Sequence, residues 1–215
     1  MNIAVNTRTA DNLTALCPRP QPLLIIVSGP SGVGKDVTLR RMKERGEPFH
    51  FLVTNTTRPQ RPGEAEGIDY HFVTVADFAR KVAADELLEY AVVYGHQYGN
   101  SKHEVEQALA RGQDVIMRID VQGAATIRRK VAGAIFIFLF ATPAELEKRL
   151  RARRTESEEA LQTRLQLAAG ELRQLDQFDY VVVNRDDELD RTVDDIKAII
   201  RAEKLRAQPR AVRFL

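Results

Sequence analysis

The sequence contains almost no cysteine: Cys17 is the single one among 215 residues. One thiol cannot form a disulfide within the chain, and no cationic segment followed by an apolar one marks the N-terminus, so we expect a cytoplasmic protein. No apolar run approaches the roughly 18 to 20 residues that a membrane-spanning helix needs. The longest runs are short and strand-like, such as 134–141. These absences predict a soluble protein with no membrane partner.

A large excess of charge of one sign is also missing. The 32 Lys and Arg residues are balanced by 30 Asp and Glu residues, which leaves a net charge of +2. Such a balance gives no reason to expect nucleic acid as a partner. The four histidines are not spaced as metal ligands, and we interpret them as surface or packing residues. The 44% of hydrophobic residues is enough for one substantial core.

The order of apolar runs and helical patterns predicts the fold class. From Leu23 a continuous apolar run, LLIIVS, is typical of a parallel strand that is buried on both faces. Strands and helices then alternate, which predicts an α/β fold with a parallel sheet and with ligands at the carboxyl ends of its strands. Further strands are predicted over 114–120, 134–141 and 180–184, and helices over about 35–44, 122–130, 143–153, 158–174 and 187–204.

Residues 49–98 show a different pattern, with shorter alternating strands (50–56, 69–74, 87–93) around one helix near 75–84. This pattern indicates a small inserted α+β lobe. Residues 1–22 carry prolines without periodicity and predict a flexible extension. The basic stretch 201–213 is interpreted as a solvated helix end. The predicted division is a core of 23–48 and 100–207, a lobe of about 49–99, a helical lid of about 143–170 and a tail of 208–215.

A phosphate-binding motif follows the first predicted strand. Residues 29–35, GPSGVGK, match G-x-x-x-x-G-K between a strand and a helix. In such a loop backbone N–H groups converge on phosphate oxygens, and Lys35 would reach the β- and γ-phosphates of ATP. The alternative is a glycine-rich turn with no ligand. The predicted ATP-binding residues are Gly29, Pro30, Ser31, Gly32, Val33, Gly34, Lys35, Asp36 and Val37.

Asp36 departs from this motif, which normally has Ser or Thr there as a Mg²⁺ ligand. A carboxylate is also a good Mg²⁺ ligand, so we predict that Asp36 binds the metal. Two alternatives stay open: Asp36 could repel the phosphates, or it could act only as a favourable charge in the first helical turn.

Downstream, the sequence resembles guanylate kinases. Residues 56–64 (TTRPQRPGE) and 67–72 (GIDYHF) resemble the signature T-T-R-x-x-R-x-G-E…G-x-D-Y-x-F of that family. The resemblance covers about 23–203 and implies a P-loop NTPase-type sheet, with ATP and Mg²⁺ used to phosphorylate GMP in purine metabolism. It continues in register through 86–90, 98–99, 119–123, 153–156, 164–165 and 183–184.

The resemblance also implies roles for individual residues. Two arginines three positions apart can present forked donors to a phosphate, and tyrosine hydroxyls can complete its shell. A carboxylate facing the N–H donors of guanine and a hydroxyl facing O6 would select this base over adenine. By the resemblance, the GMP phosphate would be held by Arg58, Arg61, Tyr70 and Tyr98, and the base would be read by Thr54 and Glu89.

Asp120 ends a buried strand, where a carboxylate needs a partner, and the other residues below carry a role by the same resemblance. Asp120 would lie near the metal or the guanine amino group, with helix capping as the alternative. Asn184 would contact the adenine of ATP, or else cap the last helix. Arg153 and Arg164 would stabilise transition-state charge, although a solvated helix face also explains them. The implied catalytic set is therefore Lys35, Arg58, Arg153 and Arg164.

Three departures from the family pattern stand out. Arg118 occupies a position that is usually acidic, and Asn100, which we still expect to bind GMP, replaces a Ser or Thr. The lid motif R-G-R-G-T is here RARRT at 151–155, and the loss of two glycines predicts a stiffer lid.

Two rival functions stay open: a kinase of another phosphorylated acceptor, such as a ribose bisphosphate, and a noncatalytic binding module. The guanine-reading pair Thr54 and Glu89 argues against the first. The presence of Lys35 and Arg153 argues against the second.

Overall fold

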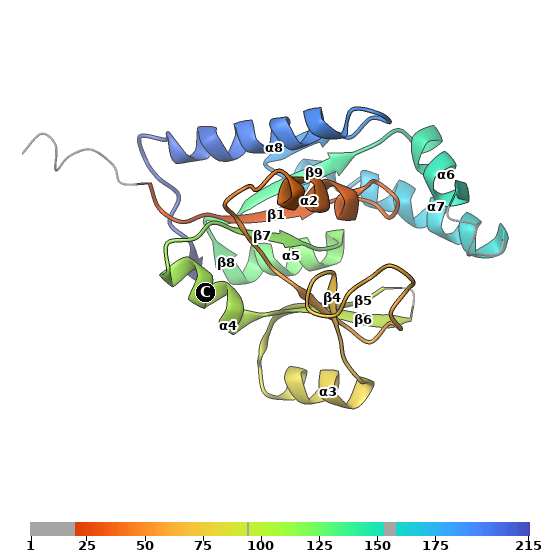
Figure 1. Ribbon diagram of the computed structural model, residues 1–215, viewed down its shortest axis with the longest axis horizontal. Coiled ribbons are helices and arrows are strands. Elements are labelled where there is room, and N and C mark those ends of the chain that lie inside the picture. Colours follow the sequence, from red (N-terminus) through yellow and green to blue (C-terminus); the bar gives the residue numbers. More distant parts are fainter. Residues whose placement is uncertain (1–19, 94, 153–157) are drawn as a thin grey trace, which may run out of the picture.

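The computed structural model describes residues 20–93, 95–152 and 158–215 (Figure 1). In this part of the chain, five parallel strands form the main sheet in the order β10-β9-β1-β7-β2. The order confirms the predicted α/β class and puts the first strand in the middle of the sheet. The strands are β1 (Leu24–Ser28), β2 (His50–Phe51), β7 (Val115–Arg118), β9 (Ile135–Phe140) and β10 (Tyr180–Val183).

The central strand β1 is buried on both faces, as its apolar run predicted. Ile25 and Val27 belong to one core cluster, whereas Leu24 and Ile26 belong to the other, because successive side chains of a strand point to opposite faces. Helices cover both faces, with α2 and α8 above the sheet and α4 and α5 below it in Figure 1. The helices are α2 (Lys35–Glu44), α4 (Lys102–Ala110), α5 (Val121–Lys130), α6 (Pro143–Ala152), α7 (Glu158–Leu172) and α8 (Leu189–Lys204).

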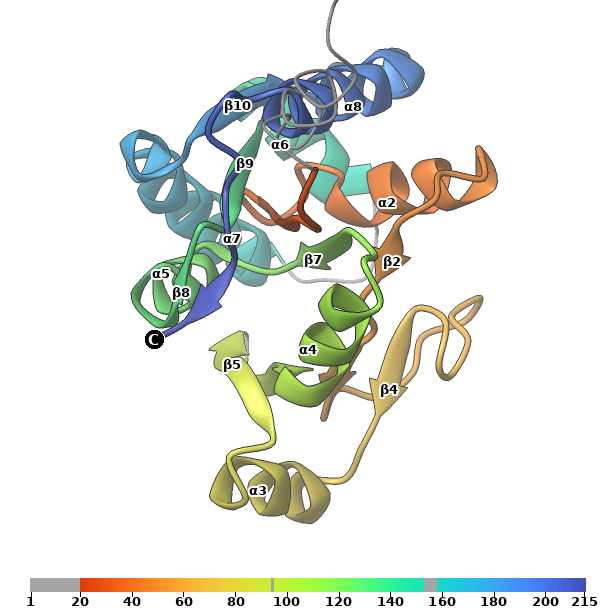
Figure 2. The ribbon, with the colours of Figure 1, turned by 90° about the vertical axis from the view of Figure 1, so that its left-hand side faces the viewer.

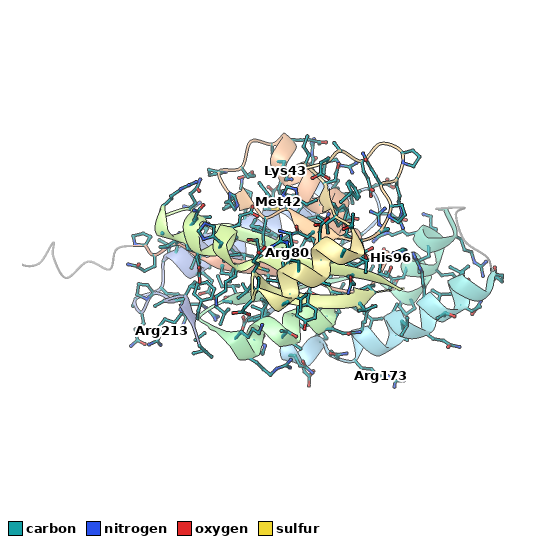
Figure 3. All side chains as sticks on the ribbon, turned by 90° about the horizontal axis from the view of Figure 1, so that it is seen from below. Met42, Lys43, Arg80, His96, Arg173 and Arg213 are labelled. Carbon is teal, nitrogen blue, oxygen red and sulfur yellow. The ribbon has the colours of Figure 1, made fainter. Side chains whose placement is uncertain are left out.

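A second sheet forms a lobe beside the core, with the strand order β4-β3-β6-β5 (Figure 2). Its helix α3 (Val75–Ala83) is capped by Thr74, whose hydroxyl accepts a hydrogen bond from the Asp77 N–H, and it buries Phe78 completely. Seen from below, Arg80 on the outer helix α3 lies near the middle of the view, and His96 lies toward α7 (Figure 3). The strands are β3 (Thr54–Thr56), β4 (Tyr70–Phe72), β5 (Leu87–Val93) and β6 (His96–Ser101).

The structure corrects two expectations about local structure. Residues 50–56 form two strands, of which β2 pairs with β7 in the core sheet and β3 pairs within the lobe. The basic stretch 201–213 is also more than a helix end. After α8 ends, β11 (Arg213–Phe214) pairs with β8 (Val131–Ala132), because Val212 and Phe214 pack against the core.

Strand β6 and helix α4 were not predicted from the sequence. The predicted flexible extension falls largely on residues 1–19, which lie outside the described residues. In the part of the chain that the structure describes, no helix is both long enough and apolar enough to cross a membrane.

Candidate active site

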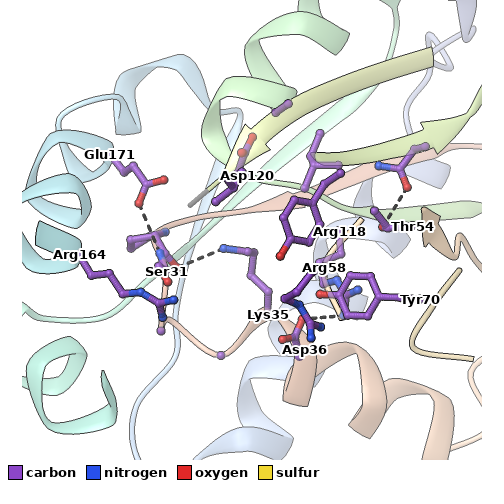
Figure 4. A pocket seen from close by; sticks show the side chains of 18 of the residues that line it. Ser31, Lys35, Asp36, Thr54, Arg58, Tyr70, Arg118, Asp120, Arg164 and Glu171 are labelled. Atoms are coloured by element: carbon purple, nitrogen blue, oxygen red, sulfur yellow. Dashed lines mark hydrogen bonds and ion pairs between the residues drawn. The ribbon is translucent and has the colours of Figure 1, made fainter. Parts of the chain in front are cut away.

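A pocket opens where β1 and β7 end, between the phosphate-binding loop, the lobe and helix α7 (Figure 4). Most of the residues predicted for the site line it, although they come from distant parts of the sequence. Gly29, Val33 and Asn184 do not line it, and Arg153 lies outside the described residues. The predicted residues that line it are Pro30, Ser31, Gly32, Gly34, Lys35, Asp36, Val37, Thr54, Arg58, Arg61, Tyr70, Glu89, Tyr98, Asn100, Asp120 and Arg164.

The phosphate-binding loop has the geometry of an anion site. Gly34 precedes α2 in the left-handed region (φ 103°), and a Cβ there would collide with the Asn184 side chain. Lys35 Nζ donates hydrogen bonds to the carbonyls of Gly29 and Pro30, the latter at 3.1 Å. Burial lowers the pKa of Lys35, and the neighbouring carboxylates, Glu171 foremost, oppose that shift. A bound phosphate would give this ammonium a further negative partner.

Asn184 supports the phosphate-binding loop through a hydrogen bond of its side chain. It does not cap the last helix, because the residue that precedes α8 is Glu188. Its Nδ2 donates to the Val33 carbonyl at 2.7 Å, and its Oδ1 accepts from the Thr192 hydroxyl at 3.0 Å. Arg149 donates to the same Val33 carbonyl at 3.0 Å and to the Asn184 carbonyl at 2.8 Å. These bonds fix the loop against α6 and α8. The contact of Asn184 with adenine stays a prediction.

On the lobe, a buried arginine faces the loop. Arg58 is 7% exposed, and its Nη2 donates to both carboxylate oxygens of Glu64, at 2.8 and 3.0 Å. Glu64 also accepts the backbone N–H of Arg61 at 2.9 Å, so one carboxylate holds the Arg58 side chain and the Arg61 backbone. Sequence reasoning assigned Glu64 no role, although its place in the arginine motif was a signal. The Arg58 guanidinium lies 5.2 Å from the centre of the Tyr70 ring.

The two predicted tyrosines lie together beside this arginine. The ring centres of Tyr70 and Tyr98 are 6.2 Å apart. Burial raises the pKa of Tyr70 to about 12, so its hydroxyl keeps its proton and can donate to a phosphate oxygen.

Buried polar residues of the lobe form a connected network. Asn100 Nδ2 donates to Glu89 Oε1 at 2.6 Å, and Asn100 Oδ1 accepts from the Thr54 hydroxyl at 3.0 Å. The role of Thr54 toward guanine O6 stays a prediction, because its hydroxyl would have to turn away from Asn100. Burial raises the pKa of Glu89 to about 7, against the lowering effect of the Asn100 hydrogen bond.

Asp120 lies next to this network. It caps α5, as the alternative interpretation proposed, by accepting the Gly123 N–H at 2.6 Å. A Cβ at Gly123 would lie 2.7 Å from Glu89 Oε2 and 3.2 Å from Asp120 Oδ1. The absence of a side chain at Gly123 therefore lets both carboxylates approach the same place, where they could accept hydrogen bonds from the N–H groups of a base.

Two charged residues of the pocket were not predicted for it. Glu171 on α7 accepts a long hydrogen bond from the Ser31 N–H, at 3.4 Å, inside the phosphate-binding loop. Arg118, known from the sequence only as an unusual residue, donates to Asp36 Oδ1 at 2.6 Å. No sequence pattern near either residue points to the loop.

The predicted metal ligand Asp36 is engaged by this arginine. Among the described residues, no group of three or more His, Cys, Asp or Glu side chains could hold a metal ion. Mg²⁺ that arrives with ATP needs only one or two carboxylates, since phosphate oxygens and water supply its other ligands. Arg118 binds Oδ1 of Asp36, and the role of the Asp36 carboxylate as a metal ligand stays a prediction.

The fold and the pocket define a class of protein. A parallel α/β sheet with a P-loop, faced by a lobe that presents arginines, tyrosines and a buried carboxylate, is the arrangement of a P-loop nucleoside monophosphate kinase. The chain belongs to the guanylate kinase family: the family model "Guanylate kinase" matches residues 21–203.

Individual relatives agree with this assignment. The chain is 46% identical to guanylate kinase 2, chloroplastic/mitochondrial, of Oryza sativa subsp. japonica, over 92% of this chain and 70% of that protein. It is 39% identical to the guanylate kinase of Carboxydothermus hydrogenoformans, over 89% and 93%. The crystal structure of guanylate kinase from Anaplasma phagocytophilum matches with a TM-score of 0.71 and 29% identity, over 87% of this chain and 88% of that one.

Proposed function

We propose that this protein transfers the γ-phosphoryl group of ATP to GMP and releases ADP and GDP. The observation that carries the proposal is one pocket that joins a P-loop lysine, Lys35, to a lobe with Arg58 and the buried carboxylate Glu89. Such a site can hold a triphosphate and a guanine nucleotide end to end.

Catalysis of this transfer depends mainly on position and charge. The P-loop N–H groups and Lys35 would hold the ATP phosphates, and Arg58, Arg61, Tyr70 and Tyr98 would hold the phosphate of GMP. Arg164 on α7 lines the same pocket and would neutralise charge on the moving phosphoryl group. Arg153, which the described residues do not include, is proposed for the same task by family resemblance. Closure of the lid would exclude water that could otherwise hydrolyse ATP.

Base selection would come from the buried carboxylates. Glu89 is 3% exposed, and with Asp120 it offers acceptors where guanine has its N1–H and amino donors. Adenine has an acceptor at N1, so it would leave a buried carboxylate without a partner, at a cost of roughly 1 to 3 kcal/mol per group.

Mg²⁺ is proposed as the companion of ATP, and it would neutralise charge on the phosphate oxygens. We further propose that residues of about 49–99, except strand β2 of the core sheet, form the acceptor lobe and that those of about 143–170 form the lid. A cytoplasmic location also stays a proposal, which the single cysteine supports.

The experiment is a steady-state assay of ADP formation with ATP, Mg²⁺ and one acceptor at a time: GMP, AMP, CMP, UMP or ribose 1,5-bisphosphate. We expect turnover with GMP that exceeds the others by at least about 100-fold in kcat/KM. The Lys35→Met variant is the control and should lose turnover. Equal turnover with AMP, or GMP binding without ADP formation, would contradict the proposal; the latter would favour a noncatalytic module.

A further inference from the structure

Arg118 lies at the junction of the P-loop helix and the lobe. It is the last residue of β7, and its side chain is 14% exposed. Its Nη1 donates to Asp36 Oδ1 at 2.6 Å, and its Nη2 donates to the Asp69 carbonyl at 3.2 Å. Its guanidinium carbon lies 4.5 Å from the centre of the Tyr70 ring. One side chain of the core sheet therefore touches the start of α2 and the lobe together.

The contacts of Arg118 direct its charge toward the acceptor half of the pocket. Tyr70, which it covers, is also in contact with the Arg58 guanidinium, at 5.2 Å from the ring centre. Tyr70 lines the pocket together with Arg58, Arg118 and Tyr98, and its ring centre lies 6.2 Å from that of Tyr98. A phosphate bound by the Tyr70 hydroxyl would have two guanidinium groups nearby, those of Arg58 and Arg118.

The ion pair with Asp36 gives Arg118 a fixed position. A nearly buried guanidinium is costly to maintain unless its donors have partners, and a planar fork fits a carboxylate better than an ammonium does. The pair spans 82 positions of the sequence and joins β7 to the first turn of α2. The guanidinium has five N–H donors, and the bonds to Asp36 and Asp69 leave it capacity for an anion.

We infer that Arg118 is a phosphate-binding residue of the acceptor site and that Asp36 is the positioning residue that holds it there. This inference rests on the proposed function, because it takes GMP as the acceptor. It also accounts for Asp36 and Arg118, two residues that depart from the pattern of the motif and of the family. A carboxylate in the first turn after the P-loop lysine would repel ATP if it stood alone, whereas Arg118 balances its charge.

The test measures binding in the absence of metal, so that phosphate transfer does not enter. Affinities of GMP, guanosine and ADP are measured by calorimetry in EDTA for the wild type, Arg118→Met, Arg118→Lys and Asp36→Asn. The matched control is Arg80→Met, which breaks an exposed lobe ion pair with Glu86, also at 2.6 Å. Melting temperatures verify that each variant is folded.

We expect Arg118→Met to raise the Kd for GMP by about tenfold or more, since it loses a charge-assisted contact. The Kd for guanosine, which has no phosphate, should change by less than about twofold. The Kd for ADP should rise in Arg118→Met, because Asp36 then repels the phosphates, and it should return toward the wild-type value in the double variant with Asp36→Asn. Arg118→Lys, which keeps the charge without the fork, should fall between Met and the wild type. The control variant should bind GMP as the wild type does.

Asp36→Asn tests the positioning role. Alone it should raise the Kd for GMP by about threefold, and it should add little to Arg118→Met, because residues that act through one contact are not additive. The free Mg²⁺ concentration for half-maximal turnover should stay within about twofold of the wild-type value, whereas a direct metal ligand would shift it by about tenfold or more.

Three results would overturn the inference. The first is an unchanged affinity for GMP in Arg118→Met, and the second is a loss of affinity for guanosine as large as the loss for GMP. The third is full additivity of the effects of Arg118→Met and Asp36→Asn. If Arg118→Met does not fold, unchanged GMP affinity in both Arg118→Lys and Asp36→Asn would overturn it as well. These outcomes are distinct from a failure of the proposed function, in which the wild type itself neither binds nor phosphorylates GMP.

Discussion

The Asn100 side-chain nitrogen donates a 2.6 Å hydrogen bond to the buried carboxylate of Glu89. The same amide accepts the Thr54 hydroxyl through its oxygen, at 3.0 Å, and exchanging its two ends would turn that oxygen toward the Glu89 carboxylate. The three residues come from the adjacent strands β3, β5 and β6. The lobe thus holds one acceptor group in a fixed orientation at the place where we propose that the base binds.

Replacement of Glu89 by Gln should remove most of the selectivity for guanine. The amide would direct an N–H donor at donors of the base, and at least one hydrogen bond to a buried charged group would be lost. We expect kcat/KM for GMP to fall by roughly 100-fold, with KM for ATP within about twofold of the wild-type value. Steady-state kinetics with both substrates measure this split. A variant that still uses GMP efficiently would show that another residue reads the base.

The affinity for GMP should depend on pH through Glu89. Burial raises the pKa of this carboxyl to about 7, and only the ionised form can accept hydrogen bonds from two guanine donors. The KM for GMP should therefore rise as the pH falls from about 8 to about 6, approaching tenfold per pH unit below the pKa. Glu89→Gln is the control, because it keeps the ionisation of the GMP phosphate and removes that of the carboxyl. Parallel pH profiles for the two proteins would contradict this assignment.

The same substitution should stabilise the fold at neutral and alkaline pH. Between about pH 4.5 and 7 the folded protein keeps a proton on Glu89 that the unfolded chain has released, so stability falls as the pH rises through this window. The shift corresponds to about 3 kcal/mol at most. We expect Glu89→Gln to melt higher than the wild type at pH 8, with a smaller difference at pH 5. Thermal unfolding at both pH values measures the effect, and a variant that melts lower at pH 8 would contradict it.

The sequence allowed the fold and the P-loop to be predicted because both depend on nearby residues. Buried parallel strands appear as continuous apolar runs, and the loop that binds phosphate is one stretch between β1 and α2. The lobe was predicted less accurately: the expected strand over 50–56 divides between two sheets, since the chain leaves the core sheet after Phe51. Short, half-buried strands carry too weak a pattern to show such a crossing.

The contacts that organise the site could not be predicted in this way. Asn184 and Val33 are 151 positions apart, and Arg118 and Asp36 are 82 apart, so no local period relates them. The family signature includes most of the residues that line the pocket. Arg118 was noticed only because it departs from that signature, and Glu171 is not part of it. Partners of this kind follow from the strand order, which brings the ends of β1, β7 and β10 to one edge of the sheet.

Removal of the Asn184 side chain should weaken the binding of ATP without affecting the binding of GMP. Asn184→Ala deletes the donor to the Val33 carbonyl and leaves the Thr192 hydroxyl without its acceptor Oδ1. We expect a loss of about 1 to 3 kcal/mol in the free energy of unfolding, and a KM for ATP raised several-fold. Thr192→Val is the matched control, because it removes the hydroxyl that bonds to Asn184 but leaves the bond from Asn184 to Val33. Its effect on the KM for ATP should therefore be smaller. Equal effects on GMP and ATP would show that Asn184 supports the whole fold and not the loop.

Neutralisation of Glu171 should strengthen the binding of ATP and ADP. Its carboxylate accepts the Ser31 N–H inside the phosphate-binding loop, and its pKa is raised by burial while Lys35 opposes that shift (Figure 4). An anion at this place competes with phosphate for the same donor and repels it. Glu171→Gln should lower the Kd for ADP by about threefold to tenfold, and the gain should shrink as salt screens the charges. Calorimetric titration at low and high ionic strength measures both effects, with Glu147→Gln as the control, since the half-exposed Glu147 carboxylate pairs with Arg151 on α6. Weaker ADP binding in Glu171→Gln would show instead that this carboxylate holds the loop in its binding conformation.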